Sequence, residues 1–529
     1  MIVGTTSEES VASPAAERSS PATVPAERWS RRHADRLAFG VAAVVFALRV
    51  LSMRHTHLSA DEALHFQLAN LPGFGDVYRS SLTNAHPPLF FLFLRSWLFF
   101  GTSELFLRLP AAFFGAAFLW ASYCWTRALL GKGAGLLTLA LLVISPALWS
   151  LSGEIRPYTL LLLLIAASLA LLEAALNARS VRLMVLFSCT LFLAILTHFA
   201  AFWFFLAAAI YAFARFREEH PPRRVFGVWA GFQGGAVLLY LFLYVTHVAN
   251  LRGGAMERGA MTRWLRAEYF QPDQDHLLAF ASRQTGALFR FLFGLPALAV
   301  LAGAAAAGGV AYLAAKKRPA ALLLVLPVLF GLGAAVLDLY PYGATRHSIY
   351  LLPFVAAAAG ALGGALTAGR LWPAALAAGV LLPLSFWTLP ASRGQDLGEM
   401  SAAIARLRSA APLGSVILAD EQTFLLLSYY LGREGFTHRM PRPQGYWEDD
   451  AAGYRIVGSG VWIFSGAGLP RELDRFVRLY GFRSGQNVWI VQAYPDYDPA
   501  AVLSRRFAGI TFPFVSGTGS LSIVEARLP

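Results

Sequence analysis

Long apolar segments alternate with short polar connections along most of the chain. Because about 17 to 25 apolar residues cross the hydrocarbon core of a bilayer, each segment of that length predicts a membrane-spanning helix. The pattern predicts about eleven spans by this length rule, at residues 37–53, 105–126, 133–151, 158–176, 182–199, 200–214, 225–246, 287–314, 320–337, 348–367 and 372–390. We therefore expect an all-α polytopic membrane domain over residues 37–390.

The basic residues provide a test of these spans. Cytoplasmic connections are enriched in Lys and Arg, so every second connection should be basic. Every second connection is indeed basic, and these connections contain Arg127 and Lys132, Arg179 and Arg182, "RFREEHPPRR" (215–224), "KKRP" (316–319) and Arg370. This alternation predicts a cytoplasmic N-terminus. It assigns to the outer face of the cytoplasmic membrane residues 54–104, 152–157, 247–286, 338–347 and all that follow 391.

One further apolar segment, "PPLFFLFLRSWLFFG" (87–101), has Arg95 in its middle. A crossing here would place Arg127 and Lys132 outside, so we predict a helix that lies along the outer interface. A true span followed by a re-entrant segment is the alternative that the sequence leaves open.

The two ends of the chain have a different composition. Residues 1–36 are rich in Ser, Ala and Pro and lack the apolar core of a signal peptide, which predicts a disordered cytoplasmic tail. After Pro390 the composition is that of a soluble protein. Apolar patterns there predict strands at 414–420, 460–466 and 487–494 and helices at 421–432 and 471–482. We expect a small external α/β domain over residues 391–529, acting as an acceptor-recognition or stabilising module.

Composition supports a membrane protein and narrows its chemistry. Hydrophobic residues make up 57% of the chain and charged residues 14%, and the mean hydropathy is +0.53. The net charge of +13 does not predict nucleic-acid binding, because the basic residues lie in small groups between apolar segments. Cys124 and Cys189 both lie in apolar segments, so neither a disulfide framework nor a thiolate metal site is expected.

The predicted outer connections contain the unusual polar residues. They are Asp61 and Glu62 in "SADEALHF", His86 in "NAHPPL", Glu154, Arg156 and Tyr158 in "GEIRPY", and Arg346 and His347 in "YPYGATRHSIYLLP". Any one of them could be an anchor at the membrane boundary. Together, acids and cations from four connections are what a site needs if it is to deprotonate an acceptor and hold a phosphate.

These segments, with "RLPAAFFGAAFLWASYCWTRALLG" after them, resemble the membrane glycosyltransferases of the GT-C fold over about residues 35–390. The branch they resemble contains the protein O-mannosyltransferases and the lipid A aminoarabinose transferases. The resemblance implies an inverting-type hexosyl or pentosyl transferase that uses a polyprenyl-phosphate sugar as donor. Its acceptor would be a lipid, glycan or protein outside the cytoplasmic membrane.

The residues themselves agree with a lipid-linked donor, since no strand-linked G-x-G-x-x-G or P-loop is present to hold a nucleotide sugar. Transfer requires a carboxylate that takes the acceptor proton and cations that stabilise the departing phosphate. We assign Asp61 as this base. On a helix Glu62 points about 100° away, so we expect it to orient hydroxyl groups.

The remaining candidates divide between phosphate and acid roles. Arg156, Arg346 and His347 are the expected phosphate ligands. His86 occupies a position where some relatives carry Lys, and it is assigned to the phosphate or to an acid partner. Relatives often have an Asp near the position of Tyr158, so Glu154 is the candidate second acid, and Glu154 and Tyr158 are the candidate donor contacts. Metal dependence stays open, because Asp61, Glu154 and His86 could hold a divalent ion whereas an Arg and His clamp needs none.

The main alternative is a polytopic transporter or flippase for a lipid-linked or anionic substrate. Such a protein would place its ionisable residues near the bilayer midplane on broken helices, often with repeat symmetry. Here the acids lie in predicted loops and the sequence shows no duplicated halves.

Overall fold

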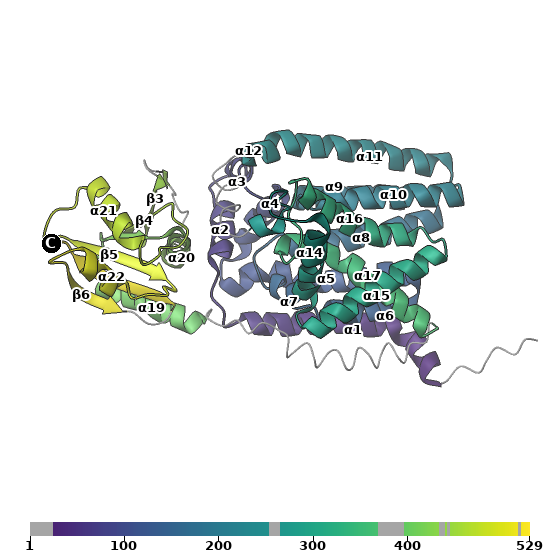
Figure 1. Ribbon diagram of the computed structural model, residues 1–529, viewed down its shortest axis with the longest axis horizontal. Helices are drawn as coiled ribbons and strands as arrows, with labels where there is room; N and C mark the ends of the chain where they lie inside the picture. The colour runs from purple at the N-terminus through teal and green to yellow at the C-terminus, as the bar shows by residue number, and fades with distance from the viewer. Residues whose placement is uncertain (1–24, 253–264, 369–395, 433–439, 442–444, 517–519) are drawn as a thin grey trace, which may run out of the picture.

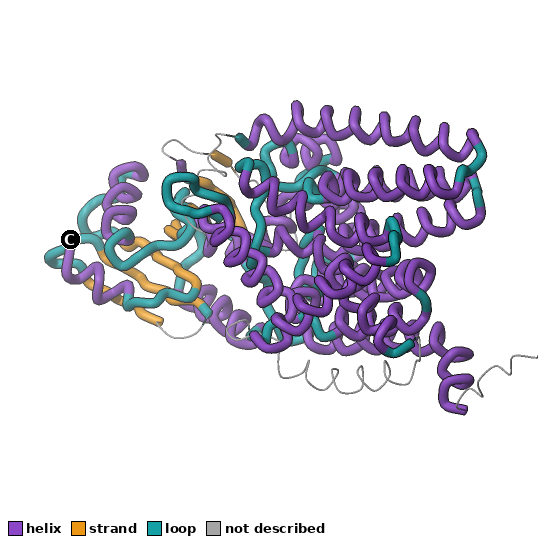
Figure 2. Tube along the Cα trace, turned by 45° about the vertical axis from the view of Figure 1, so that its right-hand side comes forward, coloured by secondary structure: helices purple, strands orange, loops and turns teal. Residues whose placement is uncertain are grey.

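The computed structural model describes residues 25–252, 265–368, 396–432, 440–441, 445–516 and 520–529. A bundle of roughly parallel helices lies beside a C-terminal region built on a β-sheet (Figure 1). The tube view shows the same two parts, with all strands confined to the C-terminal region (Figure 2).

Six helical segments within the described residues are long and apolar enough to cross a membrane. They lie in α1 (Pro25–Met53), α5 (Glu104–Leu130), α8 (Tyr158–Ala178), α11 with its extension (Arg223–Leu251), α15 (Pro296–Ala315) and η4 with α17 (Arg346–Leu366). Other helices of the bundle are α6 (Lys132–Val143), α7 (Pro146–Leu151), α9 (Val181–Thr197), α10 (Ala201–Glu219), α14 (Leu277–Phe293) and α16 (Ala320–Val336). An integral membrane protein is therefore supported, but the predicted number of spans is not confirmed.

Three predicted boundaries differ from the structure. The single span predicted at 287–314 is wrong, because the helix ends at Gly294, whose φ of 74° is easily adopted only by glycine, and α15 begins at Pro296. The span at 133–151 is interrupted between α6 and α7, where Pro146 starts a new helix. Helix α1 begins at Pro25, so the predicted tail over 1–36 extends too far into the chain. The predicted span at 372–390 lies outside the described residues.

Small residues allow several helices of the bundle to approach closely. Added to Gly309 of α15, a Cβ atom would lie 1.8 Å from the carbonyl oxygen of Ala358 in α17. A Cβ on Gly360 of α17 would lie 2.3 Å from Oγ1 of Thr138 in α6. Such close backbone contact stabilises helix pairs in lipid, where apolar side chains gain little by leaving the solvent.

The segment that joins α1 to α5 folds into short helices at one end of the bundle. These are α2 (Ala60–Ala69), α3 (Phe74–Ser81), α4 (Leu89–Trp97) and η1 (Leu98–Phe100). Together α4 and η1 reach roughly 18 Å at 1.5 Å per residue, well short of the roughly 30 Å of a hydrocarbon core. Phe99 and Phe100 are 71% and 76% exposed. These features favour a helix lying at the interface over a crossing at 87–101.

The C-terminal sheet has the strand order β2-β3-β4-β1-β5-β7-β6. The strands are β1 (Val416–Ala419), β2 (Met440–Pro441), β3 (Trp447–Ala451), β4 (Tyr454–Gly458), β5 (Asn487–Ala493), β6 (Thr511–Ser516) and β7 (Leu521–Arg527). The helices are α19 (Leu397–Ala410), α20 (Glu421–Gly432), α21 (Leu469–Tyr480) and α22 (Pro499–Arg506). Alternate residues of β1 pack on opposite faces, because Ile417 belongs to the core beneath α19 and α20, whereas Leu418 belongs to the core beneath α21.

The predicted strand at 460–466 is wrong. Its backbone bonds to the start of α20 instead of to a neighbouring strand: Val461 O accepts from Glu421 N at 2.9 Å, and Trp462 O accepts from Gln422 N at 3.2 Å. The strand beside β1 is β4, which ends at Gly458, just before this segment. The loop leaves α20 free to cover the sheet on the side of the bundle, where α20 packs against α2.

Candidate functional site

Helix α2 presents the two adjacent acids at its first turn. Ser59 caps the helix by accepting a hydrogen bond from Glu62 N at 3.3 Å, and Glu62 Oε2 accepts one from Ser59 N at 2.8 Å. This capping box, written in the sequence as S-A-D-E, fixes where the helix starts. Asp61 therefore sits one residue before a fully anchored neighbour, on a different face of the helix.

Asp61 is held between two arginines that come from distant parts of the chain. Its Oδ2 atom forms an ion pair with Nη1 of Arg346 at 2.8 Å and a shorter one with Nη2 of Arg156. The Arg156 side chain is 5% exposed, whereas Asp61 and Arg346 are 31% and 34% exposed. Three residues that the sequence placed on separate connections thus form one half-open site.

The charge and accessibility of Asp61 suit a base that stays ionised. Burial raises the pKa of Asp61, but the charges of Arg156 and Arg346 lower it further, so its pKa lies below the ordinary value. Both arginines bind the same oxygen, Oδ2. Within the part of the chain that the structure describes, no residue hydrogen-bonds to the other oxygen, Oδ1. Asp61 can therefore accept a proton at Oδ1 while the arginines hold Oδ2.

Glu62 has a different environment from the one that the sequence suggested. Its side chain is 1% exposed and forms a two-pronged ion pair with Arg108 of α5, with both N–O distances at 2.7 Å. It also accepts from Ile155 N at 3.2 Å. Burial raises its pKa, but the Arg108 charge and these hydrogen bonds lower the pKa of Glu62 below the usual value. Both carboxylate oxygens of Glu62 are therefore used by protein groups, and neither is available to a substrate hydroxyl. Glu62 instead holds α2 against α5.

Arg108 is the functional residue that sequence reasoning missed. Besides Glu62, it donates to Thr56 O at 2.8 Å and to His57 O at 2.8 Å, so it fastens the segment before α2 as well. The sequence feature that could have identified Arg108 is the "R-L-P" segment on α5, whose arginine is 2% exposed in the structure. A buried arginine in an apolar helix requires a carboxylate partner, and Glu62 was available.

Glu154 lies beside the arginine site without an ion pair to it among the described residues. Ser150 Oγ donates to its Oε1 at 2.9 Å. Burial raises the pKa of Glu154 above the usual value, and the charge of Arg156 offsets only part of this effect. Glu154 is thus the carboxylate at the site that holds a proton most readily, which keeps it a candidate for the second acid.

The predicted residues His86, Tyr158 and His347 lie in a ring cluster near Asp61, in which His86 and Tyr158 are buried and His347 is half-buried. His86 lies 5.8 Å from Tyr158 and 4.9 Å from His198, and His347 lies 6.3 Å from Tyr158, all between ring centroids. His65 joins the cluster 5.8 Å from His86, and its Nδ1–H donates to Asp61 O at 2.7 Å. Sequence reasoning selected neither His198 nor His65 as a site residue, although His65 lies one helical turn from Asp61.

The cluster is polar but uncharged. Burial, together with the charge of Arg156, lowers the pKa of His65 to about 3, and burial with the neighbouring histidines holds the pKa of His86 well below its usual value. Buried polar atoms of the cluster without a hydrogen-bond partner in the described residues are His65 Nε2, His86 Nδ1, His198 Nε2 and the Tyr158 hydroxyl. Neutral imidazole and phenol groups can donate to or accept from sugar hydroxyls and phosphate oxygens.

The residues that could have held a divalent ion, Asp61, Glu154 and His86, do not form a metal site in the described residues. No group of three or more His, Cys, Asp or Glu side chains is arranged there to hold an ion. Both arginines bind Oδ2 of Asp61, and His86 contacts aromatic and imidazole rings instead of carboxylates. The geometry therefore fits a clamp of cations better than a divalent ion.

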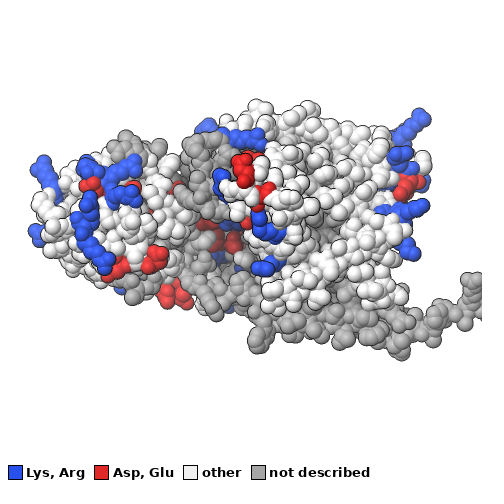
Figure 3. All heavy atoms as spheres, in the orientation of Figure 1, with Lys and Arg blue, Asp and Glu red and all other residues white. Residues whose placement is uncertain are grey.

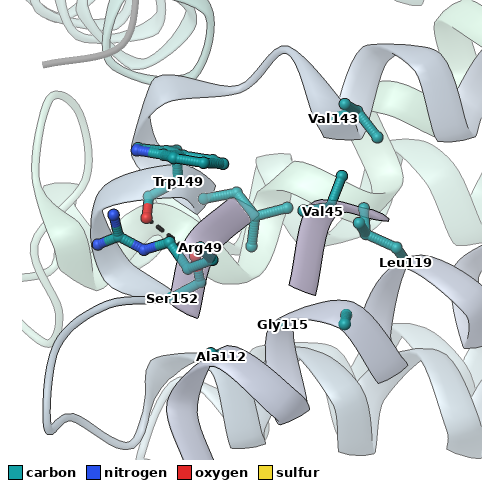
Figure 4. Close-up of a pocket in the computed structure, with 10 residues that line it drawn as sticks. Val45, Arg49, Ala112, Gly115, Leu119, Val143, Trp149 and Ser152 are labelled. Atoms are coloured by element: carbon teal, nitrogen blue, oxygen red, sulfur yellow. Dashed lines mark hydrogen bonds between the residues drawn. The ribbon is translucent and has the colours of Figure 1, made fainter. Parts of the chain in front are cut away.

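A small pocket lies near the end of α1, with Arg49, Trp149 and Ser152 among the residues that line it (Figure 4). Arg49 stacks on Trp149 at 5.0 Å and donates to Ser150 O at 3.1 Å. A Cβ on Gly153 would lie 1.6 Å from Arg49 Nη2, so any larger residue there would displace the Arg49 guanidinium. Asp61, Arg156 and Arg346 do not line the pocket. The pocket is therefore separate from the arginine site.

Charged side chains gather at both ends of the bundle. Basic side chains, with some acidic ones among them, lie at the end where α10 and α11 meet, and acidic and basic side chains also lie where the bundle meets the C-terminal region (Figure 3). The candidate site lies at the second end, as the predicted alternation of basic connections requires.

Comparisons with known proteins agree with this architecture. The family model for dolichyl-phosphate-mannose-protein mannosyltransferases matches residues 85–249. No curated protein matches the sequence. The structure is similar to that of ArnT from Cupriavidus metallidurans in the apo state, with a TM-score of 0.54, 16% identity, and coverage of 95% of this chain and 98% of ArnT.

Two other solved structures extend the likeness. ArnT from Cupriavidus metallidurans bound to undecaprenyl phosphate matches with a TM-score of 0.54 and 15% identity, over 92% of this chain and 97% of that one. The Archaeoglobus fulgidus oligosaccharyltransferase tethered to an acceptor peptide with the NVT sequon matches with a TM-score of 0.52 and 13% identity, over 95% and 75%. These likenesses show the fold, and they confirm the resemblance drawn from the sequence.

Proposed function

From a GT-C fold that resembles the protein O-mannosyltransferase and aminoarabinose transferase branch, we propose that this protein is a glycosyltransferase using a polyprenyl-phosphate-linked sugar. It transfers a hexosyl or pentosyl group to a lipid, glycan or protein acceptor on the outer face of the cytoplasmic membrane. The single observation that carries the proposal is the geometry of Asp61. Arg156 and Arg346 hold its Oδ2 atom, and its Oδ1 atom can accept a proton. One of the similar ArnT structures has undecaprenyl phosphate bound, which supports a donor of this class.

In the proposed reaction the acceptor hydroxyl gives its proton to Asp61 Oδ1 as its oxygen forms a bond to the anomeric carbon. The bond from that carbon to the phosphate oxygen breaks, and the electron pair leaves with the polyprenyl phosphate. Arg156 and Arg346 stabilise the departing charge, and the fork of each guanidinium suits phosphate oxygens.

The two arginines also link donor binding to the strength of the base. With both of them on Oδ2, Asp61 is a weak base because its pKa is lowered. A bound phosphate competes for the same guanidinium groups, and each one that turns toward phosphate removes part of that effect. Asp61 then becomes a stronger base only when the donor is present, which limits transfer to the filled site.

The test uses purified full-length protein in nanodiscs. It is supplied with a polyprenyl-phosphate sugar or, separately, with the matching nucleotide sugar, and transfer or slow donor hydrolysis is measured. We expect only the lipid-linked donor to be consumed. Asp61→Asn should bind it with at least about a 10²-fold loss in turnover, since the amide cannot take the proton.

Arg346→Lys gives a second, independent measurement. Lysine keeps the charge but loses the fork, so donor use should fall roughly tenfold while the melting temperature stays close to that of the wild type. Undiminished transfer by Asp61→Asn would remove the proposed base. Movement of the intact donor across the membrane of reconstituted liposomes without cleavage would favour the transporter or flippase alternative.

A further inference from the structure

The segment that leads from α1 into α2 is held by the C-terminal region at four consecutive residues. His55 O accepts from Leu397 N at 2.9 Å, and Thr56 forms a β-bridge with Asp396. The ring of His57 hydrogen-bonds to the Tyr494 hydroxyl, and Leu58 N donates to the Tyr430 hydroxyl at 3.0 Å. Ser59, the cap of α2, follows directly.

The opposite side of this segment is fastened to the membrane bundle. Arg108 of α5 binds the carbonyl oxygens of Thr56 and His57 and the carboxylate of Glu62. The entry to α2 is therefore clamped between α5 and the C-terminal region. Since Asp61 is the second residue of α2, the direction in which the helix starts sets where its carboxylate lies.

The body of α2 depends on the same region. Gln67 Nε2 donates to Leu425 O at 3.2 Å, and the rings of Phe66 and Tyr429 meet edge to face at 4.9 Å. Ala63 and Phe66 of α2 share one buried core with Phe424 and Leu425 of α20. A helix of only 10 residues is marginal without such support.

We propose that the C-terminal region positions the base, with Tyr430 as the positioning residue whose hydroxyl fixes the start of α2. Arg156 precedes α8 and Arg346 begins η4, and within the described residues neither arginine bonds to the C-terminal region. A displacement of the α2 entry therefore moves Asp61 relative to both arginines. This inference rests on the proposed role of Asp61 and adds a second domain to the catalytic assembly.

Tyr430→Phe removes the hydroxyl and leaves Leu58 N without its acceptor. We expect kcat to fall roughly tenfold, because misplacing a reacting group by a fraction of an ångström weakens catalysis, while donor affinity changes less than about twofold. The acid limb of the pH profile should also move to higher pH. Asp61 loses part of its arginine contact, its pKa rises toward the usual value, and the base becomes protonated at a higher pH.

Tyr497→Phe is the matched control, because Tyr497 lies in the same region and donates to Gln492 Oε1 at 2.6 Å, away from α2. Its kinetics and pH profile should match the wild type. A loss in Tyr430→Phe that is equalled in Tyr497→Phe, or that leaves the acid limb in place, would show a general stabilising role and overturn the proposal.

Amide hydrogen exchange provides a readout that needs no turnover. Peptides covering residues 55–66 should exchange faster in Tyr430→Phe than in the wild type and Tyr497→Phe. If the wild type transfers no sugar, the proposed function fails, yet faster exchange would still show that Tyr430 positions α2. Exchange over 55–66 that is identical in all three proteins would overturn the positioning inference while leaving the transferase proposal intact.

Discussion

At the residue scale, two neighbouring carboxylates have different environments because a helix turns about 100° per residue. Asp61 is partly exposed between two arginines, whereas Glu62 is buried against Arg108. The sequence shows the pair of acids but not which arginine each one meets. Glu62 meets Arg108, 46 residues away, and Asp61 meets both Arg156 and Arg346, the second of them 285 residues away.

Glu62→Gln should therefore affect stability first. It leaves the Arg108 guanidinium buried without a counter-charge, which costs about 3 to 5 kcal/mol when one partner of a buried pair is removed. Thermal unfolding in detergent measures this effect. The control is Asp474→Asn, which breaks the exposed pair with Arg478 and should cost less than about 1 kcal/mol. Equal melting temperatures for the two variants would contradict a structural role for Glu62.

At the element scale, β1 and α20 join the sheet to the bundle, and Asp420 lies at their junction. Its carboxylate is fully buried and accepts from Thr423 N at 2.8 Å and from Phe464 N at 3.1 Å. It therefore caps α20 and also fixes the loop that the sequence suggested was a strand. Burial outweighs these hydrogen bonds and raises the pKa of Asp420 to about 6.

This raised pKa makes stability depend on pH. The unfolded carboxyl has a pKa of about 3.9, so the folded state binds the proton more tightly. The contribution of protonated Asp420 to the free energy of unfolding is fully present below about pH 4. It is lost as the pH rises through about 6, which lowers the free energy of unfolding by roughly 3 kcal/mol. Melting temperatures of the wild type and Asp420→Asn between pH 4 and 7 should differ in slope. A parallel pH dependence of the two proteins would contradict this prediction.

At the scale of the whole molecule, the candidate site and the C-terminal region share one end of the bundle, and the basic ends of α10 and α11 lie at the other (Figures 1 and 3). The arrangement predicts that the C-terminal region is outside the cytoplasmic membrane. In a background with Cys124 and Cys189 replaced by Ser, Asp474→Cys should react with an impermeant thiol reagent on intact cells. Arg217→Cys should react only after lysis. The reverse pattern would invert the topology and the proposed location of the donor.

The sequence by itself determined the properties that depend on local composition and spacing. Apolar length predicted the helical membrane region, and basic connections predicted which loops share a face. It also predicted β1, α20, α21 and β5, whose patterns are strong over short windows.

Only the tertiary structure decided the properties that depend on contacts between distant residues. Arg156 and Arg346 both bind one oxygen of Asp61, whereas Glu62 forms a buried ion pair with Arg108. The segment 460–466 has the short apolar run of a buried strand, yet its backbone carbonyl groups accept hydrogen bonds from the start of α20. Charge pairing and backbone hydrogen bonding are satisfied by whichever partner the fold brings within about 3 Å, and no local pattern specifies that partner.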